Sequence, residues 1–166
     1  AALEAVAAEL SERGAQAAAA GSAEARDVLE ALAMMARDVE LAEAIAGRID
    51  AGLAAPRAVF EAFAGYRRML AGAGEYLAAR VADLDDVRDR ALARLLGLPM
   101  PGVPRRSEPF VLVARDLAPA DTVALDPERV VAFVTEEGGP TSHTAILARA
   151  LGVPAVVACP GCTQLA

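Results

Sequence analysis

Four prolines fall within residues 99–109, and this short segment divides the chain into two parts with different sequence patterns. Proline has no backbone N–H, and its ring clashes with the preceding helical turn, so a segment of this kind cannot form the interior of a helix or of a strand. We therefore expect a linker over residues 99–109, between one domain over residues 1–98 and a second domain over residues 110–166.

The first part has the pattern of packed helices. Apolar side chains recur at three- and four-residue spacing, and glycine or proline interrupts the pattern at residues 21–22, 52–56 and 72–74. Ser22 is expected to cap one helix, and Pro56 suits the first turn of another. The short interruptions favour antiparallel helical hairpins. The expected helices cover residues 2–20, 23–36, 38–51, 56–71 and 75–97.

The second part contains short runs rich in β-branched residues, at 110–114, 130–135 and 154–158. A helix expected over residues 142–151 lies between the last two runs. Strand, helix and strand in this order form a βαβ unit with parallel strands. The expected fold class is therefore an all-helical bundle followed by an α/β domain.

Charge and composition exclude several function classes. The net charge is −7 and the pI is about 4.8, which argues against a nucleic-acid backbone or an anionic membrane as the main partner. Residues 1–98 hold 11 arginines against 16 acids, so a basic protein partner fits better. All 16 basic residues are arginine, and therefore no lysine can form a Schiff base or serve a phosphate-binding loop.

Localisation follows from what the sequence lacks. We find no continuous apolar stretch long enough to span a bilayer, and no secretory or targeting signal at the start of the sequence. A cytoplasmic setting is therefore expected.

The only histidine of the chain, His143, directly follows Thr141 and Ser142 at the expected start of a helix. The first N–H groups of a helix have no intrahelical partner and lie at the positive end of its dipole, so they can hold an anion beside the imidazole. Thr141 or Ser142 can supply a capping oxygen, while Gly138 and Gly139 allow positive φ or a close approach to a phosphate. Imidazole is also a good nucleophile near neutral pH. The residues alone support a phosphate site and a structural histidine about equally.

Cys159 and Cys162 form a Cys-Pro-Gly-Cys pair. A redox dithiol usually needs a following helix to lower a thiol pKa, and a zinc site that included His143 would lack a fourth protein ligand. We therefore expect small residues in a turn after a strand rather than a redox or metal site.

Residues 138–149, Gly-Gly-Pro-Thr-Ser-His-Thr-Ala-Ile-Leu-Ala-Arg, resemble the phosphohistidine segment of phosphoenolpyruvate-utilising enzymes. That group includes Enzyme I of the sugar phosphotransferase system, pyruvate phosphate dikinase and phosphoenolpyruvate synthase. Thr144, after the histidine, resembles Enzyme I, whereas the other branches more often have alanine there. Residues 29–41, 75–90 and 114–122 also resemble the N-terminal part of Enzyme I, in which a helical domain directly precedes the motif.

Resemblance to Enzyme I implies a helical domain that binds the carrier protein HPr, followed by an incomplete α/β phosphohistidine domain, also called the swivelling domain. It implies that the domain that binds phosphoenolpyruvate lies outside these residues. The implied function is that of a phosphoenolpyruvate-protein phosphotransferase in sugar uptake. No cofactor is implied for this fragment, whereas Mg2+ and a homodimer are implied for the full-length enzyme.

The resemblance also implies roles for single residues. His143 would accept a phosphoryl group on Nε2 and pass it to a histidine of HPr, and Thr122 would orient the ring or fix its tautomer, although Thr122 equally fits a plain turn. Arg149 is expected to hold the helix in place. The phosphate-positioning residues would be Gly138, Gly139, Thr141, Ser142 and Thr144. The residues that contact HPr would be Met34, Met35, Leu41, Leu77 and Arg80.

Two other functions remain open at this point. The first is a pure interaction module, in which the acidic bundle binds a basic protein and His143 carries no phosphate. The second is the dikinase or synthase branch, in which a nucleotide is the other phosphoryl donor. Acid-labile phosphate on His143 would exclude the module, and phosphorylation that depends on ATP would favour the second branch.

Overall fold

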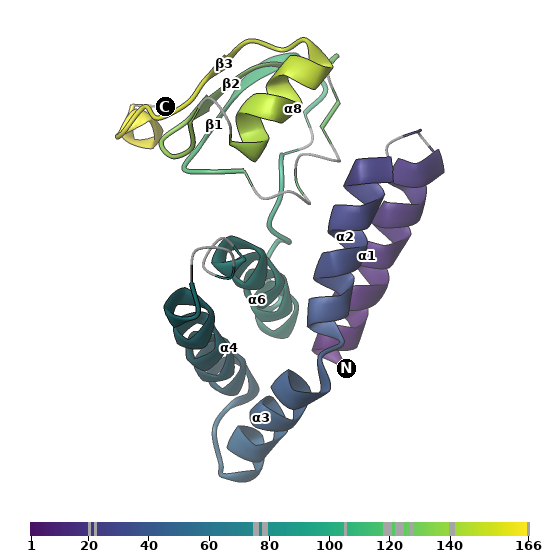
Figure 1. The fold of residues 1–166 in the computed structure, drawn as a ribbon, viewed down its shortest axis with the longest axis vertical. Coiled ribbons are helices and arrows are strands. Elements are labelled where there is room, and N and C mark those ends of the chain that lie inside the picture. Colours follow the sequence, from purple (N-terminus) through teal and green to yellow (C-terminus); the bar gives the residue numbers. More distant parts are fainter. Residues whose placement is uncertain are drawn as a thin grey trace. The chain divides into compact units, whose positions relative to one another are not determined.

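The computed structural model describes residues 1–19, 21, 23–74, 77, 80–104, 106–117, 121, 125–126, 128–139 and 142–165 (Figure 1). The chain forms two compact units, Ala1–Pro101 and Gly102–Ala166, and the division falls inside the proline-rich segment. The first unit is helical, and the second combines helix with a parallel sheet. The expected fold class is therefore confirmed.

The helices of the first unit follow the apolar spacing of the sequence. In the first helix the buried positions include Val6, Leu10 and Gly14, which recur every four residues and so share one face. Pro56 lies in the first turn of its helix, as expected. The expected cap Ser22 lies outside the described residues. The described helices are α1 (Ala2–Ala19), α2 (Ala23–Ala36), α3 (Val39–Asp50), α4 (Ala55–Gly72) and α6 (Val81–Leu96).

The last helix of this unit differs from the expectation of one helix over residues 75–97. Helix α6 begins at Val81, and Arg80 lies in a turn whose N–H donates to the carbonyl of Leu77 at 3.0 Å. A bond from a residue to the third one before it belongs to a turn rather than to an α-helix. The long helix predicted from periodicity is therefore shorter at its start.

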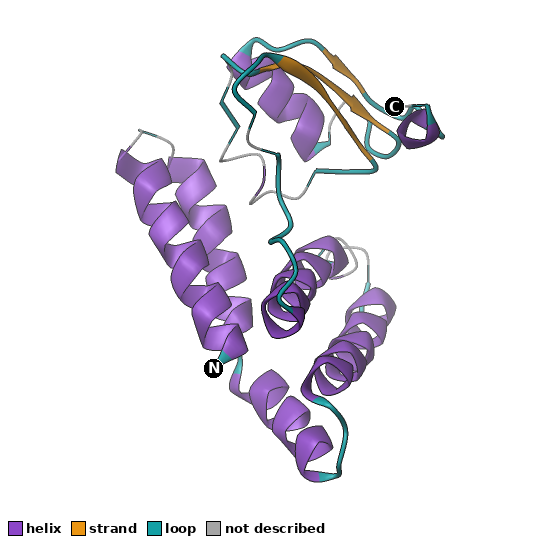
Figure 2. Cartoon of the chain, turned by 180° about the vertical axis from the view of Figure 1, so that it is seen from behind, coloured by secondary structure: helices purple, strands orange, loops and turns teal. Residues whose placement is uncertain are grey.

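Helices α1 and α2 form a hairpin and lie side by side in both views (Figures 1 and 2). Gly14 of α1 faces α2, because a Cβ added there would be in ordinary van der Waals contact with the Cβ of Leu29, at 3.6 Å. Leu29 and Leu32 on α2 are fully buried, and each such side chain contributes about 1.5–3 kcal/mol by leaving water. The hairpin is thus built on small and branched apolar residues rather than on aromatic ones.

A buried ion pair joins two turns of α6. The Nε of Arg90 donates to Oδ2 of Asp86 at 2.9 Å, and Arg90 is fully buried. Glu9 on α1 approaches Arg90 at 3.8 Å and accepts from Arg94 at 2.6 Å. Charged groups at this depth are stable only when they are paired, so these contacts fix α6 against α1.

The second unit contains the expected βαβ arrangement. Its elements are β1 (Phe110–Ala114), β2 (Val130–Thr135), α8 (His143–Leu151), β3 (Ala155–Val156) and the short 3-10 helix η1 (Cys162–Gln164). The sheet order is β1-β2-β3 and both pairings are parallel, with α8 connecting β2 to β3.

The third strand is shorter than the expected run over residues 154–158. Only Ala155 and Val156 pair with β2. Ala158 has a φ of +55°, which takes the chain out of the extended conformation, and the N–H groups of Ala158 and Cys159 donate instead to the carbonyls of Glu137 and Thr135. The chain therefore turns across the end of β2 and does not extend the sheet.

The core of the second unit lies between the sheet and α8, which covers one face of the sheet (Figure 2). Phe133 from β2, Leu112 from β1 and Ala148 from α8 belong to one buried cluster. This packing places the first turn of α8 near the carboxyl ends of β1 and β2, where ligands bind in many open parallel sheets. No helix within the described ranges is long and apolar enough to span a membrane.

Candidate functional site

Ser142 forms the cap of α8. Its backbone is extended, with φ −65° and ψ 157°, and its Oγ accepts a hydrogen bond from the N–H of Ala145 at 3.3 Å. The carbonyl of Ser142 accepts from the N–H of Ile146 at 3.0 Å, which is the first intrahelical bond. These contacts are those of an N-cap residue.

His143 is the first residue of α8. In a helix that starts here, the N–H groups of His143 and Thr144 have no carbonyl partner four residues earlier, and they point out of the positive end of the helix dipole. This end of α8 can therefore hold an anion. Thr122 and Thr141, to which the sequence assigns roles, lie outside the described residues. For His143 the structure describes the backbone only.

Thr144 differs from the other expected phosphate-positioning residues, because its side chain is buried at 1% exposure. Its hydroxyl therefore faces the interior of the unit and not a ligand in solvent. What Thr144 can offer to an anion is its backbone N–H at the start of α8.

The turn before α8 depends on Gly138. Its φ is +95°, a conformation that side chains rarely adopt, and an added Cβ would lie only 3.0 Å from Oγ of Ser142. Gly139 has no such requirement, because its φ is outside the left-handed region and no atom lies within 4 Å of an added Cβ. The Ser142 N–H donates to the carbonyl of Gly139 at 2.9 Å and closes the turn.

The segment that leads to this turn continues the parallel pairing of β1 and β2. The N–H of Glu136 donates to the carbonyl of Ala114 at 3.1 Å, and that of Glu137 donates to the carbonyl of Arg115 at 2.9 Å. Thr135 is fully buried, and its hydroxyl donates to the carbonyl of Glu137 at 2.8 Å. The residues before Gly138 are thus fixed by main-chain and side-chain bonds.

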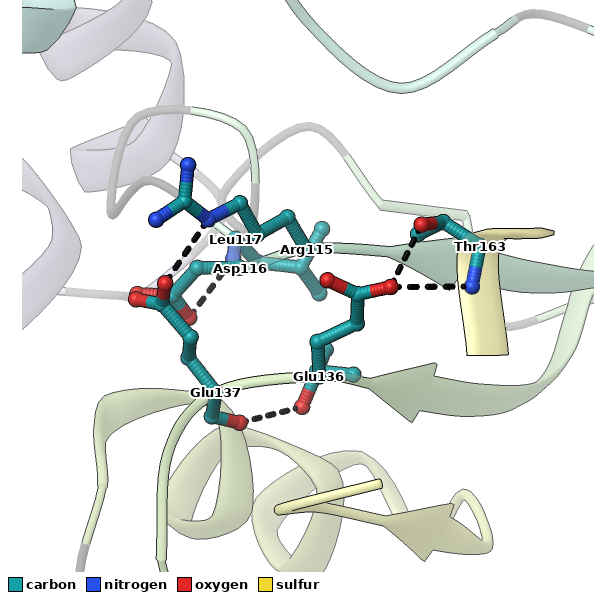
Figure 3. Close-up of polar contacts among 7 residues, drawn as sticks. Arg115, Asp116, Leu117, Glu136, Glu137 and Thr163 are labelled. Carbon is teal, nitrogen blue, oxygen red and sulfur yellow. Dashed lines mark hydrogen bonds and ion pairs between the residues drawn. The ribbon is translucent and has the colours of Figure 1, made fainter. Parts of the chain in front are cut away.

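Two carboxylates at the end of β2 have separate partners (Figure 3). Glu137 accepts from Nε of Arg115 at 2.7 Å, and this hydrogen bond raises the pKa of the Arg115 guanidinium. Glu136 accepts from both the hydroxyl and the N–H of Thr163, at 2.5 and 3.2 Å. These two bonds lower the pKa of Glu136 from its ordinary value, so the carboxylate stays ionised.

Sequence reasoning did not assign a role to Thr135, Glu136 or Arg115. The only signal in the sequence was the acidic pair directly before the two glycines. The partner Thr163 lies 27 residues further along the chain, and local patterns do not predict such a contact.

Arg149 lies in the last turn of α8, about 9 Å along the axis from its start. Together with Ala145 and Ala148 it lines one wall of a cavity of about 290 Å³, whose other wall includes Val153, Ala155 and Val157. Arg149 is therefore far from the anion-binding end of α8, as its sequence position predicts.

The residues expected to contact HPr have different exposures. Met34 is 70% exposed and Leu77 is 37% exposed, whereas Met35 is half-buried. Arg80 is exposed and forms an ion pair with Asp83 at 3.0 Å. Leu41 is buried at 1% exposure, so it belongs to the helical core and does not present a docking surface. Apolar spacing alone could not separate a core leucine from an exposed methionine.

Within the part of the chain that the structure describes, no group of three or more acidic, histidine or cysteine side chains could hold a metal ion.

Comparison with known families matches both units. Residues 1–80 match the family described as PEP-utilising enzyme, N-terminal, and residues 106–166 match the one described as PEP-utilising enzyme, mobile domain. The fold and the capped helix of His143 thus occur in a chain of the class of PEP-utilising enzymes, with a helical N-terminal domain followed by a mobile domain.

Within the PEP-utilising enzymes, the individual relatives that this chain resembles are phosphoenolpyruvate-protein phosphotransferases. A phosphoenolpyruvate-protein phosphotransferase of Streptomyces coelicolor is 66% identical over 99% of this chain and 29% of its own length. One of Haloferax volcanii is 39% identical over 78% of this chain and 23% of its own length. The chain therefore spans less than a third of the length of these curated relatives.

Solved structures agree with these relatives. A solution structure of Enzyme I (nEIt) has a TM-score of 0.78 and 36% identity, over 99% of this chain and 67% of that one. The N-terminal domain of "Enzyme 1 - Nitrogen" has a TM-score of 0.65 and 29% identity, over 94% of this chain and 64% of that one. The chain belongs to the phosphoenolpyruvate-protein phosphotransferases, the Enzyme I family.

Proposed function

We propose that His143 is the phosphorylated residue of a phosphoenolpyruvate-protein phosphotransferase, and that this chain is the part that exchanges the phosphoryl group with HPr. The observation that carries the proposal is the position of His143 as first residue of α8, directly after the cap Ser142. A phosphoryl group on the imidazole would lie beside the free N–H groups of the first turn, which favour negative charge.

The transfer requires little covalent help from other side chains. As Nε2 of His143 forms its bond to phosphorus, the bond from phosphorus to the donor breaks, and the charge on the phosphoryl oxygens needs donors already in place. The bond from the Ser142 N–H to the carbonyl of Gly139 and the close approach of Gly138 to Ser142 supply a preformed support, because both are present without a phosphate. Nε2 is nucleophilic only with the proton on Nδ1, and Thr122 is our candidate for the residue that selects this tautomer.

HPr is the proposed partner of the helical unit. Met34 and Leu77 provide exposed apolar surface, and Arg80 lies three residues after Leu77. The unit carries more acids than arginines, so it suits a basic partner surface. Phosphoenolpyruvate would phosphorylate His143 through a domain outside these residues, with Mg2+ held by that domain. A cytoplasmic, homodimeric full-length enzyme active in sugar uptake is part of the same proposal.

The dikinase or synthase alternative is weaker. By the resemblance, that branch does not place a helical domain directly before the motif, whereas this chain matches an N-terminal family over residues 1–80 and a mobile domain over residues 106–166. The Streptomyces coelicolor relative, 66% identical over 99% of this chain, is named a phosphoenolpyruvate-protein phosphotransferase. The interaction module remains the contrasting function, because it needs no phosphate on His143.

The test is phosphate exchange with HPr. This chain is incubated with phosphorylated HPr, and acid-labile, alkali-stable phosphate is located by mass spectrometry. We expect label on His143, no label in His143→Ala at unchanged circular dichroism, and none from phosphoenolpyruvate or ATP alone. Equal labelling of His143→Ala and the unchanged chain would reject His143 as the site. Absence of label on both of these chains would favour the interaction module. Label that depends on ATP would favour the dikinase or synthase branch.

A further inference from the structure

Cys159 and Cys162 occupy the two ends of one tight turn. The N–H of Cys162 donates to the carbonyl of Cys159 at 3.2 Å, which closes a four-residue turn. Pro160 and Gly161 fill its centre, and Gly161 has φ 81° and ψ 2°, the values of the third residue of a type II turn. Proline at the second position and glycine at the third are the residues that this turn prefers, so little conformational freedom is left to it.

This turn has the right span for a disulfide. The Cα atoms at the two ends of such a turn lie within about 7 Å of each other, and disulfides join Cα atoms about 4.4–6.8 Å apart. Both cysteines are free thiols in the structure. The backbone of the turn therefore holds the two Cα atoms at a separation that a disulfide can bridge.

The ends of the turn are attached to the end of β2. The N–H of Cys159 donates to the carbonyl of Thr135 at 2.9 Å. On the other side, Thr163 donates twice to the carboxylate of Glu136, at 2.5 and 3.2 Å (Figure 3). Thr135 and Glu136 lie two to three residues before Gly138. The end of β2 therefore holds the cysteine turn and also leads into the segment before α8.

Contrary to the expectation from the sequence, we infer from this turn geometry that Cys159 and Cys162 form a reversible intramolecular disulfide by exchange with a low-molecular-weight disulfide. The Cys159 thiolate attacks one sulfur of the small disulfide, and one small thiolate leaves. Cys162 gives up its proton and attacks the Cys159 sulfur of the mixed disulfide, and the second small thiolate leaves. Two electrons pass from the cysteine pair to the small disulfide, which is reduced to two thiols.

The order of the two attacks follows from exposure. Cys162 is buried at 8% exposure, whereas Cys159 is half-buried and more accessible to a small molecule. Burial raises the pKa of the Cys162 thiol, and the neighbouring Cys159 and Glu136 add to this effect. A disulfide oxidises other proteins strongly when a stabilised thiolate lowers the free energy of its reduced form. Cys162 has no such stabilisation, so this disulfide is not expected to oxidise other proteins.

The inference is independent of the proposed phosphoryl relay, because its readout is the mass and thiol count of the chain. The folded protein is equilibrated with reduced and oxidised glutathione, quenched with acid and measured as the intact chain. We expect a species that has lost two hydrogens, carries no glutathione and has no thiol reactive to maleimide. Dithiothreitol should restore both thiols.

Variants and a denatured sample separate this site from ordinary cysteine chemistry. Cys162→Ser should accumulate one glutathione on Cys159, because the second attack is lost. The ratio of disulfide to mixed disulfide should be about tenfold higher in the folded chain than in urea. Gly161→Ala should reduce that ratio, because a side chain is strained at φ +81° although no atom lies within 4 Å. Two glutathiones per chain, disulfide-linked dimers, or equal ratios in the folded and denatured chain would overturn the inference.

Discussion

Oγ of Ser142 lies 3.0 Å from the position that a Cβ at Gly138 would take. The same oxygen caps α8 by accepting from the N–H of Ala145. The four-residue spacing between the glycine and the serine therefore reflects a steric requirement, because the capping oxygen needs the space that a side chain would fill.

Gly138→Ala should destabilise the protein by about 1–3 kcal/mol, because alanine is strained at φ +95° and would displace the Ser142 hydroxyl. Gly139→Ala is the matched control, since its added Cβ meets no atom within 4 Å. Urea denaturation measures both free energies of unfolding. Equal losses for the two variants would show that the turn does not depend on the space at Gly138.

Asp86→Ala should cost about 3–5 kcal/mol of stability, because it leaves the fully buried guanidinium of Arg90 without its partner at 2.9 Å. Glu61→Ala should change stability by less than about 1 kcal/mol, although its pair with Arg57 is 2.6 Å long, because both side chains of that pair are exposed. Chemical denaturation of the two variants compares the pairs directly. A small effect of Asp86→Ala would mean that the other contacts of Arg90, Glu9 among them, are enough to hold its guanidinium.

Thr163→Val should bring the pKa of Glu136 back up toward its ordinary value, because the hydrogen bond from the Thr163 hydroxyl is the largest cause of its lowering. A lowered pKa in the folded state gives a stabilising contribution that is fully present above the unfolded value of about 4.3 and is lost as the pH falls through the folded value. NMR titration of the Glu136 carboxyl carbon measures the shift. An unchanged titration in the variant would assign the lowering to the backbone instead.

Met34→Asp should raise the rate of dissociation from HPr by about tenfold, because a charged group would replace an exposed apolar contact in the proposed docking surface. Leu165→Asp makes the same kind of change at a residue of the second unit that is 91% exposed, and it should leave that rate unchanged. Stopped-flow or surface-based kinetics would compare them. Equal effects of both variants would reject Met34 as a contact.

Local sequence patterns predicted the elements whose residues alone determine their conformation. The start of α8 at His143 lies within one residue of the expected start at 142, because Ser142 is a strong N-cap. Strands β1 and β2 have the expected bounds because their β-branched runs are bounded by turns. The third strand was predicted too long, since the positive φ of Ala158 arises from its contact with the end of β2.

The same distinction applies to the site. A capped helix with the histidine at its start is local and was predicted, whereas the double bond from Thr163 to Glu136 joins residues 27 apart and depends on how the chain returns to β2. Leu41 shows a further limit, because a helical repeat does not tell which apolar face the neighbouring helices cover.

The ion pair between Glu9 and Arg94 joins two residues that are 85 positions apart in the sequence, one in the first helix of the helical unit and one in the last. Synthesis on the ribosome proceeds from the N-terminus, so α1 emerges long before α6 is available. Until then the hairpin of α1 and α2 lacks the helix that carries Arg90 and Arg94, which pair with Glu9 in the folded unit. The helical unit therefore completes its packing only when α6 has left the exit tunnel.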